Sequence, residues 1–339
     1  MSAEPAGPAW PDGPSRRWVT AACDALIRAG VAVERDVSLK EHTTFRIGGK
    51  VRVLAAVTKP EQAVAVVTLA RRLCVPVRCL GGGSNVLVSD DGVPGVVMIN
   101  RISGLAFDGG TICVGGGHGW DELVEATCVR GLGGMSAMSG IPGSVGGAIC
   151  GNAGAYGRSV SGSLISVTVV NPDGSLTVLA PDELGFRYRH SRLKETGQVV
   201  VEAAFALKGA DPARLSEHRD AILATRAAKL PAKSERTAGS FFKNIEREAD
   251  RKRLTRLLDL PDSEHRIAAG LLLDKVGARG MCVGDAAVFE RHANIIVNRG
   301  HATARDVLEL SRRMRRMVRE AFAIELEREV MWFGEQEPD

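Results

Sequence analysis

A run of three consecutive glycines at residues 81–83 constrains this chain more than any other feature. It lies between two short apolar segments in the sequence CLGGGSNVLV and is followed at once by Ser84 and Asn85. Glycine has no Cβ, so such a turn lets several backbone N–H groups approach one bound anion, although it can also serve only to reverse a strand. A second glycine-rich segment over 139–157 favours binding, because two such segments can grip a large phosphate-bearing ligand from two sides.

The composition is that of a globular protein. Of 339 residues, 45% are hydrophobic and 25% charged, which suits two or three domains. The formal net charge of +4 is too small to argue for nucleic-acid binding. The basic clusters at 251–253 and 312–316 are better interpreted as solvated helix faces, so we expect no nucleic-acid partner.

The cysteines and the N-terminus indicate a cellular compartment. Seven cysteines occur, with no CxxC pair and no histidines at zinc-finger spacing, so we expect reduced thiols in a cytoplasmic protein and no metal site. Cys150, in the second glycine segment, is interpreted as a small buried side chain, with a covalent link to a ligand as the alternative. Residues 1–15 are rich in Pro, Ala and Gly and predict a disordered tail, and no apolar run is long enough to cross a membrane.

The predicted helices and strands fall into two groups, one before and one after a junction at Asp211 and Pro212. These two residues suit the N-cap and first turn of a long helix that ends near residue 230. Before this junction we expect strands over 51–57, 76–80, 93–99, 111–114, 167–170, 176–179 and 199–207, and helices over 18–29, 60–73 and 120–130. After it we expect helices over 246–258, 268–276 and 304–323, and strands over 286–289, 295–297 and 330–333. The pattern predicts an α+β protein.

The first glycine loop does not fit a Rossmann unit. In that fold the loop GxGxxG leads at once into a long helix. Here the residues after the loop, VLVSDDG, are strand-like. We therefore expect a dinucleotide to be held on a scaffold of mixed strands.

Six motifs follow one another between about residues 35 and 335: HTTFRIGG, GGGSNVLVSDDG, SGIPGSVGGA with NAGAYG, YRHS, GSFFKN and ERHAN. Together they resemble the UDP-N-acetylenolpyruvoylglucosamine reductases, the FAD- and NADPH-dependent UDP-N-acetylmuramate dehydrogenases of peptidoglycan precursor synthesis. The resemblance implies an FAD-binding domain of the vanillyl-alcohol-oxidase (PCMH) type, followed by a smaller α+β substrate-binding domain. We expect the first over 16–209, as two subdomains divided near 80–100, and the second over 210–335.

The resemblance also implies the ligands. These are non-covalent FAD, NADPH as co-substrate, and a UDP-sugar enolpyruvyl ether as substrate. We expect a monomer, with an oligomer as the alternative. On the resemblance, the FAD-binding residues are Arg46, Gly81, Gly82, Gly83, Ser84, Asn85, Ser139, Gly140, Ile141, Pro142, Gly143, Ser144, Gly146, Gly147, Asn152, Gly154, Ala155, Tyr156 and Gly157.

Three catalytic residues follow from the implied reaction. Hydride addition to the vinyl carbon of an enol ether leaves carbanion character beside a carboxylate, which needs cationic and proton-donating groups placed in advance. On the resemblance, Arg189 binds the carboxylate, Glu329 shares or donates a hydrogen bond, and Ser240 protonates the neighbouring carbon. The structural alternatives are a surface ion pair for Arg189 and a helix cap for Ser240.

The choice of Glu329 over Glu327 rests on the alignment alone, because residues two apart share one face of a regular strand. The resemblance implies that the substrate is bound by Tyr188, Lys243, Asn244 and His292. Functional alternatives are an FAD-dependent paralogue acting on another sugar nucleotide, an oxidase of the same fold, or a flavin-binding protein without activity.

The chain departs from the family pattern in two places. A charged helical insertion occupies residues 245–267, next to the proposed acid, where it could alter a substrate lip or an oligomer contact. The long tyrosine-bearing loop of one subtype has no counterpart, since Tyr156 and Tyr188 are the two tyrosines of the chain. The short connection therefore resembles the subtype that lacks this loop.

Overall fold

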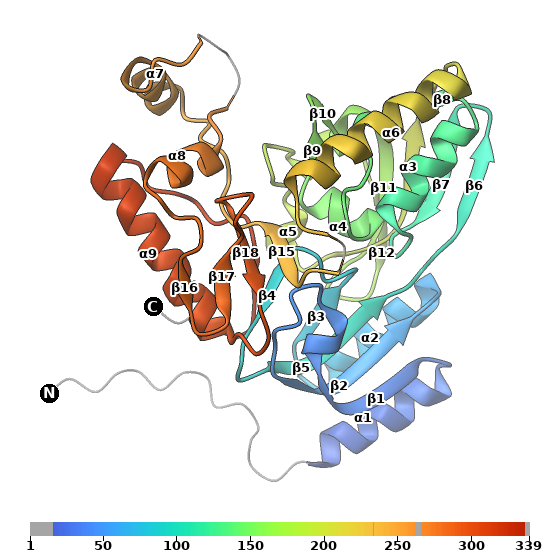
Figure 1. The fold of residues 1–339 in the computed structure, drawn as a ribbon. Helices are drawn as coiled ribbons and strands as arrows, with labels where there is room; N and C mark the ends of the chain where they lie inside the picture. The colour runs from blue at the N-terminus through green and yellow to red at the C-terminus, as the bar shows by residue number, and fades with distance from the viewer. Residues whose placement is uncertain (1–15, 233, 262–265, 336–339) are drawn as a thin grey trace, which may run out of the picture.

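The computed structural model describes residues 16–232, 234–261 and 266–335. They form three units that meet around one central region (Figure 1). The predicted disordered tail at 1–15 lies outside the described residues. Among the described helices, none is long and apolar enough to cross a membrane.

The first unit is a mixed four-stranded sheet covered by two helices. Its strand order is β1-β2-β5-β3, with β5 parallel to both β2 and β3 and with β1 antiparallel to β2. The strands are β1 (Ala32–Ser38), β2 (Lys50–Val57), β3 (Val77–Leu80) and β5 (Val93–Asn100), and the helices are α1 (Arg16–Arg28) and α2 (Pro60–Arg72). Apolar residues of both helices and of the sheet form one buried cluster, which includes Leu26, Val66 and Val53.

The second unit is an antiparallel five-stranded sheet of order β12-β11-β13-β7-β6. Its strands are β6 (Leu105–Asp108), β7 (Thr111–Gly115), β11 (Leu164–Val170), β12 (Leu176–Leu179) and β13 (Val199–Ala206), and its main helices are α3 (Trp120–Val129), α4 (Val145–Cys150) and α6 (Pro212–Lys229). Trp120 packs edge-on against Phe205 in its core. The strands expected over 167–170 and 176–179 are confirmed and form an antiparallel hairpin, in which Val170 pairs with Leu176 across the turn.

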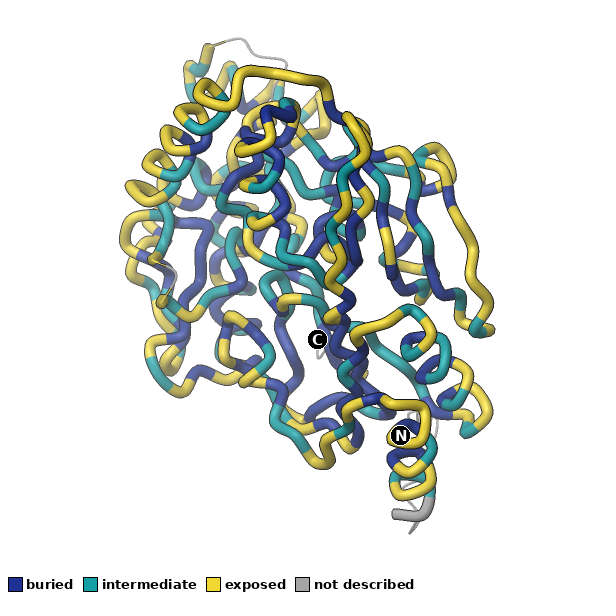
Figure 2. Tube along the Cα trace, turned by 90° about the vertical axis from the view of Figure 1, so that its right-hand side faces the viewer, coloured by how far each residue is buried: buried dark blue, intermediate teal, exposed yellow. Residues whose placement is uncertain are grey.

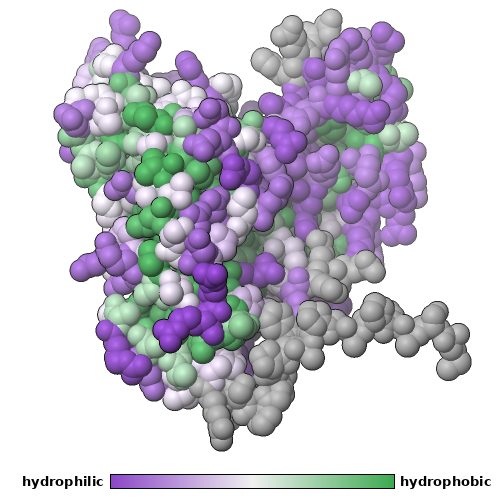
Figure 3. Space-filling view, turned by 180° about the vertical axis from the view of Figure 1, so that it is seen from behind, coloured by the Kyte–Doolittle hydropathy of each residue, from purple (hydrophilic) through white to green (hydrophobic). Residues whose placement is uncertain are grey.

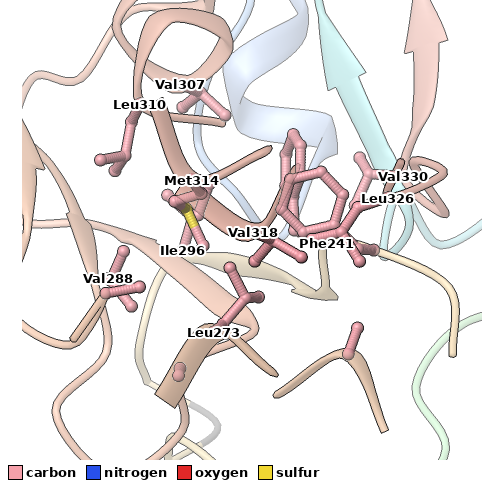
Figure 4. Close-up of a cluster of buried hydrophobic side chains, with 14 of the residues drawn as sticks. Phe241, Leu273, Val288, Ile296, Val307, Leu310, Met314, Val318, Leu326 and Val330 are labelled. Atoms are coloured by element: carbon pink, nitrogen blue, oxygen red, sulfur yellow. The ribbon is translucent and has the colours of Figure 1, made fainter. Parts of the chain in front are cut away.

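The third unit is a four-stranded antiparallel sheet of order β15-β18-β17-β16 with three helices. Its elements are β15 (Thr237–Ser240), α7 (Glu248–Leu257), α8 (Ala269–Lys275), β16 (Cys282–Val283), β17 (Ala286–Val288), β18 (Ile295–Asn298) and α9 (Ala304–Phe322). The buried face of α9 meets Phe241 and Val330 in its core (Figure 4). Figure 3 shows that the outer surface of this unit is mostly hydrophilic. Figure 2, which looks from the side of the second unit, shows exposed segments on the outside of the molecule and buried segments within it.

The chain after the first glycine loop joins the first and third units. Strand β4 (Val86–Val88) pairs in parallel with β19 (Met331–Phe333) near the C-terminus. Both carboxylate oxygens of Asp90 then accept hydrogen bonds from the first turn of α9, from the N–H groups of Ala304 at 2.8 Å and Arg305 at 3.1 Å. The strand expected after the loop is therefore confirmed. The segment that follows the loop is held by strand β19 and by the first turn of α9.

Helix α6 bears on the predicted domain boundaries. Our division at 209/210 places it in the C-terminal domain, but Arg219 of α6 lies 2.6 Å from Asp121 of α3, and the two helices run side by side in Figure 1. These contacts favour a boundary after Lys229. Similarly, β3 and β5 both belong to the first sheet, which favours a subdomain division after Asn100.

Candidate active site

The two glycine segments face each other at the centre of the molecule. A Cβ placed on Gly82 would lie 2.9 Å from the Cα of Gly143, and one on Gly143 would lie 2.6 Å from the Oγ of Ser84. A hydrogen bond joins the segments directly, because the Ser84 hydroxyl donates to the carbonyl of Pro142 at 3.2 Å. The absence of side chains is therefore needed for this close approach, and the segments form one composite wall.

A third segment, the loop at 42–47, closes this wall from the side. The Thr44 N–H donates to the carbonyl of Gly83 at 3.1 Å, and the Thr44 hydroxyl donates to the carbonyl of Thr237 at 2.7 Å. Gly83 has φ +61°, and a Cβ there would collide with the carbonyl of His42. Thr44 thus links the first glycine loop to strand β15, at whose end Ser240 lies.

A cavity of about 1410 Å³ lies along these loops. Its lining includes Gly81, Gly82, Gly143, Ser144, Arg46 and Arg101. Backbone groups without Cβ atoms beside cationic side chains suit a large ligand that carries phosphates. Arg46 is paired with Glu41 and remains half-exposed, so its charge can reach such a ligand.

Other residues of the second glycine segment are engaged within the protein. The Ser139 hydroxyl donates to the carbonyl of Ser136 at 2.6 Å, and the Gly140 N–H donates to Asp121 at 2.7 Å. The amide of Asn152 donates to the carbonyl of Arg187 at 3.0 Å and accepts from the N–H of Ser161 at 3.2 Å. These groups fix the shape of the segment, and Asn152 also ties it to the chain that carries Arg189.

Arg189 and Glu329 come together although 140 residues separate them. The Nε of Arg189 lies 2.7 Å from Oε1 of Glu329, and its terminal nitrogen donates to the carbonyl of Gly154 at 2.9 Å. The Glu329 side chain is only 15% exposed. Burial raises the pKa of this carboxyl, against the opposing charges of Arg189 and Lys194. The pair thus joins a fixed cation to a carboxyl that holds its proton more readily than usual.

Glu327 and Glu329 do not share a face. The segment around them is not a regular strand, because its ladder contact is a single bridge between Arg328 and Phe242. Glu327 is 75% exposed and lies 3.0 Å from the ammonium of Lys243. The expectation that the two carboxylates point the same way is therefore wrong, and the buried one is Glu329.

Ser240 lies at the end of β15 and does not cap a helix. The chain continues in extended form, with the Phe241 N–H donating to the carbonyl of Asn294 at 2.8 Å. The Glu329 N–H donates to the Phe241 carbonyl at 2.8 Å, which brings the carboxyl-bearing segment beside Ser240. Phe241 and Val330, the direct neighbours of the two candidates, are buried in the same core (Figure 4).

The four predicted substrate-binding residues divide into two groups. Tyr188 accepts a hydrogen bond from the Asn244 N–H at 3.3 Å, and Lys243 directly precedes Asn244 in the chain. His292 is in a separate turn, where its Nδ1 accepts from the Asn294 N–H at 3.3 Å. Among the described residues, His292 forms no hydrogen bond or ion pair with Arg189 or Glu329.

Sequence reasoning missed two supporting residues near this pair. The Lys194 ammonium is half-buried and donates to the carbonyl of Arg189 at 2.7 Å, and burial lowers its pKa. Asn294 is 2% exposed, and its amide both accepts from the Phe242 N–H at 2.9 Å and donates to the Phe242 carbonyl at 2.8 Å. The ERHAN motif contains Asn294, but nothing in the sequence marks it as a support for the chain after Ser240.

Comparisons with known proteins agree with this geometry. Residues 230–333 match the model of the C-terminal domain of UDP-N-acetylenolpyruvoylglucosamine reductase, and residues 51–180 match that of an FAD binding domain. A protein of Symbiobacterium thermophilum named UDP-N-acetylenolpyruvoylglucosamine reductase 2 is 39% identical over 318 residues, which are 91% of this chain and 95% of that one. The chain belongs to the UDP-N-acetylenolpyruvoylglucosamine reductase family.

Further members of the family cover almost the whole chain. The reductase of Synechococcus sp. is 37% identical over 94% of this chain and 99% of its own length. The crystal structure of the reductase from Thermus caldophilus superposes with a TM-score of 0.72 at 34% identity, and covers 89% of this chain and 99% of that one. The resemblance and the α+β fold with an FAD-binding part before a C-terminal domain are thus confirmed.

Proposed function

We propose that this protein is an FAD-containing, NADPH-dependent oxidoreductase that reduces UDP-N-acetylglucosamine enolpyruvate to UDP-N-acetylmuramate in peptidoglycan precursor biosynthesis. The observation that carries the proposal is the buried contact between Arg189 and Glu329 beside Ser240. An alcohol oxidase has no use for this set, because it forms no carbanion next to a carboxylate. Family membership supports the same reaction.

The residues around the cavity fit FAD. Gly82, Gly143 and Ser144 would hold its pyrophosphate through backbone groups, since side chains on these glycines would fill the space between the two loops. Arg46 would add a positive charge. When bound, FAD supplies the hydride transfer between NADPH and the double bond of the substrate.

The protein groups then act on the carboxylate and on the proton. Arg189 would pair with the substrate carboxylate as negative charge develops on it, because a guanidinium offers two parallel donors. Glu329, protonated more readily than usual because it is buried, would donate a hydrogen bond to the same oxygens. Ser240 would give its proton to the adjacent carbon, which is a strong base in that state. Tyr188, Lys243 and Asn244 would bind the rest of the substrate, with His292 farther from the reacting atoms.

We propose a monomer in the cytoplasm, in line with the small-molecule substrate implied by the family and with seven cysteines that are all unpaired in the described chain.

An anaerobic absorbance experiment tests the function. Adding NADPH to the FAD-loaded protein should bleach the visible flavin band, and adding UDP-N-acetylglucosamine enolpyruvate should restore it. Bleaching without recovery would contradict the proposed substrate, and a protein that binds no FAD would contradict the assignment of both glycine loops.

A further inference from the structure

The insertion at 245–267 is docked onto the third unit at several points. Its ends pair with each other, since the backbones of Ile245 and Ile267 exchange hydrogen bonds of 2.8 and 3.1 Å. Leu254 of α7 is fully buried in the core of the third unit. The Arg253 guanidinium donates to the carbonyl of Ala323 at the end of α9, at 3.1 Å. The two paired ends of the insertion, which we call its base, therefore have a fixed position. Helix α7 lies away from the sheets of the first and second units (Figure 1).

That base holds Tyr188 from two directions. At one end, the Asn244 N–H donates to the tyrosine hydroxyl at 3.3 Å. At the other end, the Arg266 guanidinium lies 3.8 Å from the centre of the tyrosine ring, within the range of a cation–π contact. Arg266 is itself oriented by Glu246, whose carboxylate accepts from its Nε at 3.3 Å. Both contacts come from segments at the ends of the insertion.

Tyr188 directly precedes Arg189, whose backbone needs support. Arg189 has φ +54°, a left-handed conformation that costs a non-glycine residue free energy and persists only where neighbours fix it. Lys194 fixes the carbonyl side of Arg189, as described above. Tyr188, which is held by Asn244 and Arg266, fixes the backbone on the N-terminal side of Arg189.

We propose that Arg266 is a positioning residue of the active site, which stacks on Tyr188 and so holds the Arg189 guanidinium against Glu329. The inference deepens the proposed function and rests on it. It gives the insertion a role in the reaction, through a residue at its base. Arg266 itself need not touch the substrate.

Rates of the two half-reactions provide the first test. In R266L, the reoxidation of reduced flavin by UDP-N-acetylglucosamine enolpyruvate should slow about two- to fivefold, the value of a cation–π contact at a partly exposed site. Flavin reduction by NADPH should keep its wild-type rate. R266K should recover part of the loss, and R256L, which makes the same change elsewhere in the insertion, should behave as wild type.

A double-mutant cycle shows whether Arg266 acts through the ring. Removing Arg266 in a Y188L background should cause no further loss, because the contact is already gone. Equal losses in both backgrounds, or an R266L enzyme as fast as wild type, would overturn the inference. If the wild-type enzyme itself is not reoxidised by the enol ether, the proposed function has failed.

A spectroscopic measurement is independent of turnover. With tyrosines labelled by 13C in the ring, the FAD-loaded protein should show two sets of signals, assigned by Y156F. R266L should move the Tyr188 signals and raise the pKa of Tyr188, because Arg266 is among the charges that lower it. Unmoved Tyr188 signals would overturn the inference whatever the substrate is.

Discussion

Replacing Asn294 by alanine should destabilise the protein strongly, because its amide serves two backbone groups that have no access to water. The side chain is 2% exposed and hydrogen-bonds both the N–H and the C=O of Phe242, at 2.9 and 2.8 Å. Each buried polar group left without a partner costs about 1–3 kcal/mol. We therefore expect the free energy of unfolding to fall by about 2–5 kcal/mol. Since Phe242 follows Ser240 by two residues, the turnover number should fall as well.

Urea unfolding at saturating FAD measures this change, since a fixed ligand excess keeps the contribution of binding constant. Asn171 provides a matched control. Its amide donates hydrogen bonds of 2.9 and 2.7 Å to Ser175 and Thr177 and accepts one of 2.7 Å from Gln198, but at the surface of the protein. Water can replace such partners, so N171A should cost about 1 kcal/mol or less. An N294A protein no less stable than N171A would refute the reasoning, because the backbone of Phe242 would then have found another partner.

Three further predictions concern the site itself. G82A should weaken FAD binding at least about tenfold, because its Cβ would lie 2.9 Å from Gly143 and must push the two loops apart. G104A, which has open space around its Cβ, should bind FAD normally. Titration of the apoprotein with FAD measures both affinities. E329Q should lower the turnover number by about 10²- to 10⁴-fold, while E327Q, which changes an exposed carboxylate paired with Lys243, should stay close to wild type in steady-state assays. Burial raises the pKa of Glu329 above its usual value of 4.5, so the folded protein holds a proton there that the unfolded chain has lost, and this group lowers the free energy of unfolding as pH rises through that window. E329Q removes this negative contribution, so its free energy of unfolding should change more positively with pH above 4.5 than that of the wild type, and an unchanged slope would contradict the burial effect.

Local sequence signals predicted most elements because they act over a few residues. Pro60 begins α2, and Asp211 caps α6 by accepting from the N–H of Ala213 at 2.9 Å, as their residue types suggested. Strand β1 and helix α4 were not predicted, because their local signals are weak. Strand β1 has few buried side chains, and α4 contains two glycines in six residues, which lowers its helix propensity.

The arrangement of the site depended on contacts that no local pattern contains. Glu327 and Glu329 differ in burial because the backbone between them is irregular, and an alternation rule assumes a regular strand. Arg266 meets Tyr188 only because the ends of the insertion pair with each other. The two glycine loops could be predicted from the sequence, because runs of glycine are visible there. The direct contact between them could not be predicted, because it depends on the fold.

The position of β4 explains how the first glycine loop and the segment that carries Glu329 are held in a fixed relative position. Asn85 ends the first glycine loop, where its carbonyl accepts from the Met331 N–H at 3.0 Å and its side-chain amide donates to the Glu329 carbonyl at 3.4 Å. The parallel pairing of β4 with β19 extends this connection. A displacement of the loop would therefore displace the backbone of Glu329. Because Glu329 in turn contacts Arg189 of the second unit, each of the three units holds one side of the site, and none could form it alone.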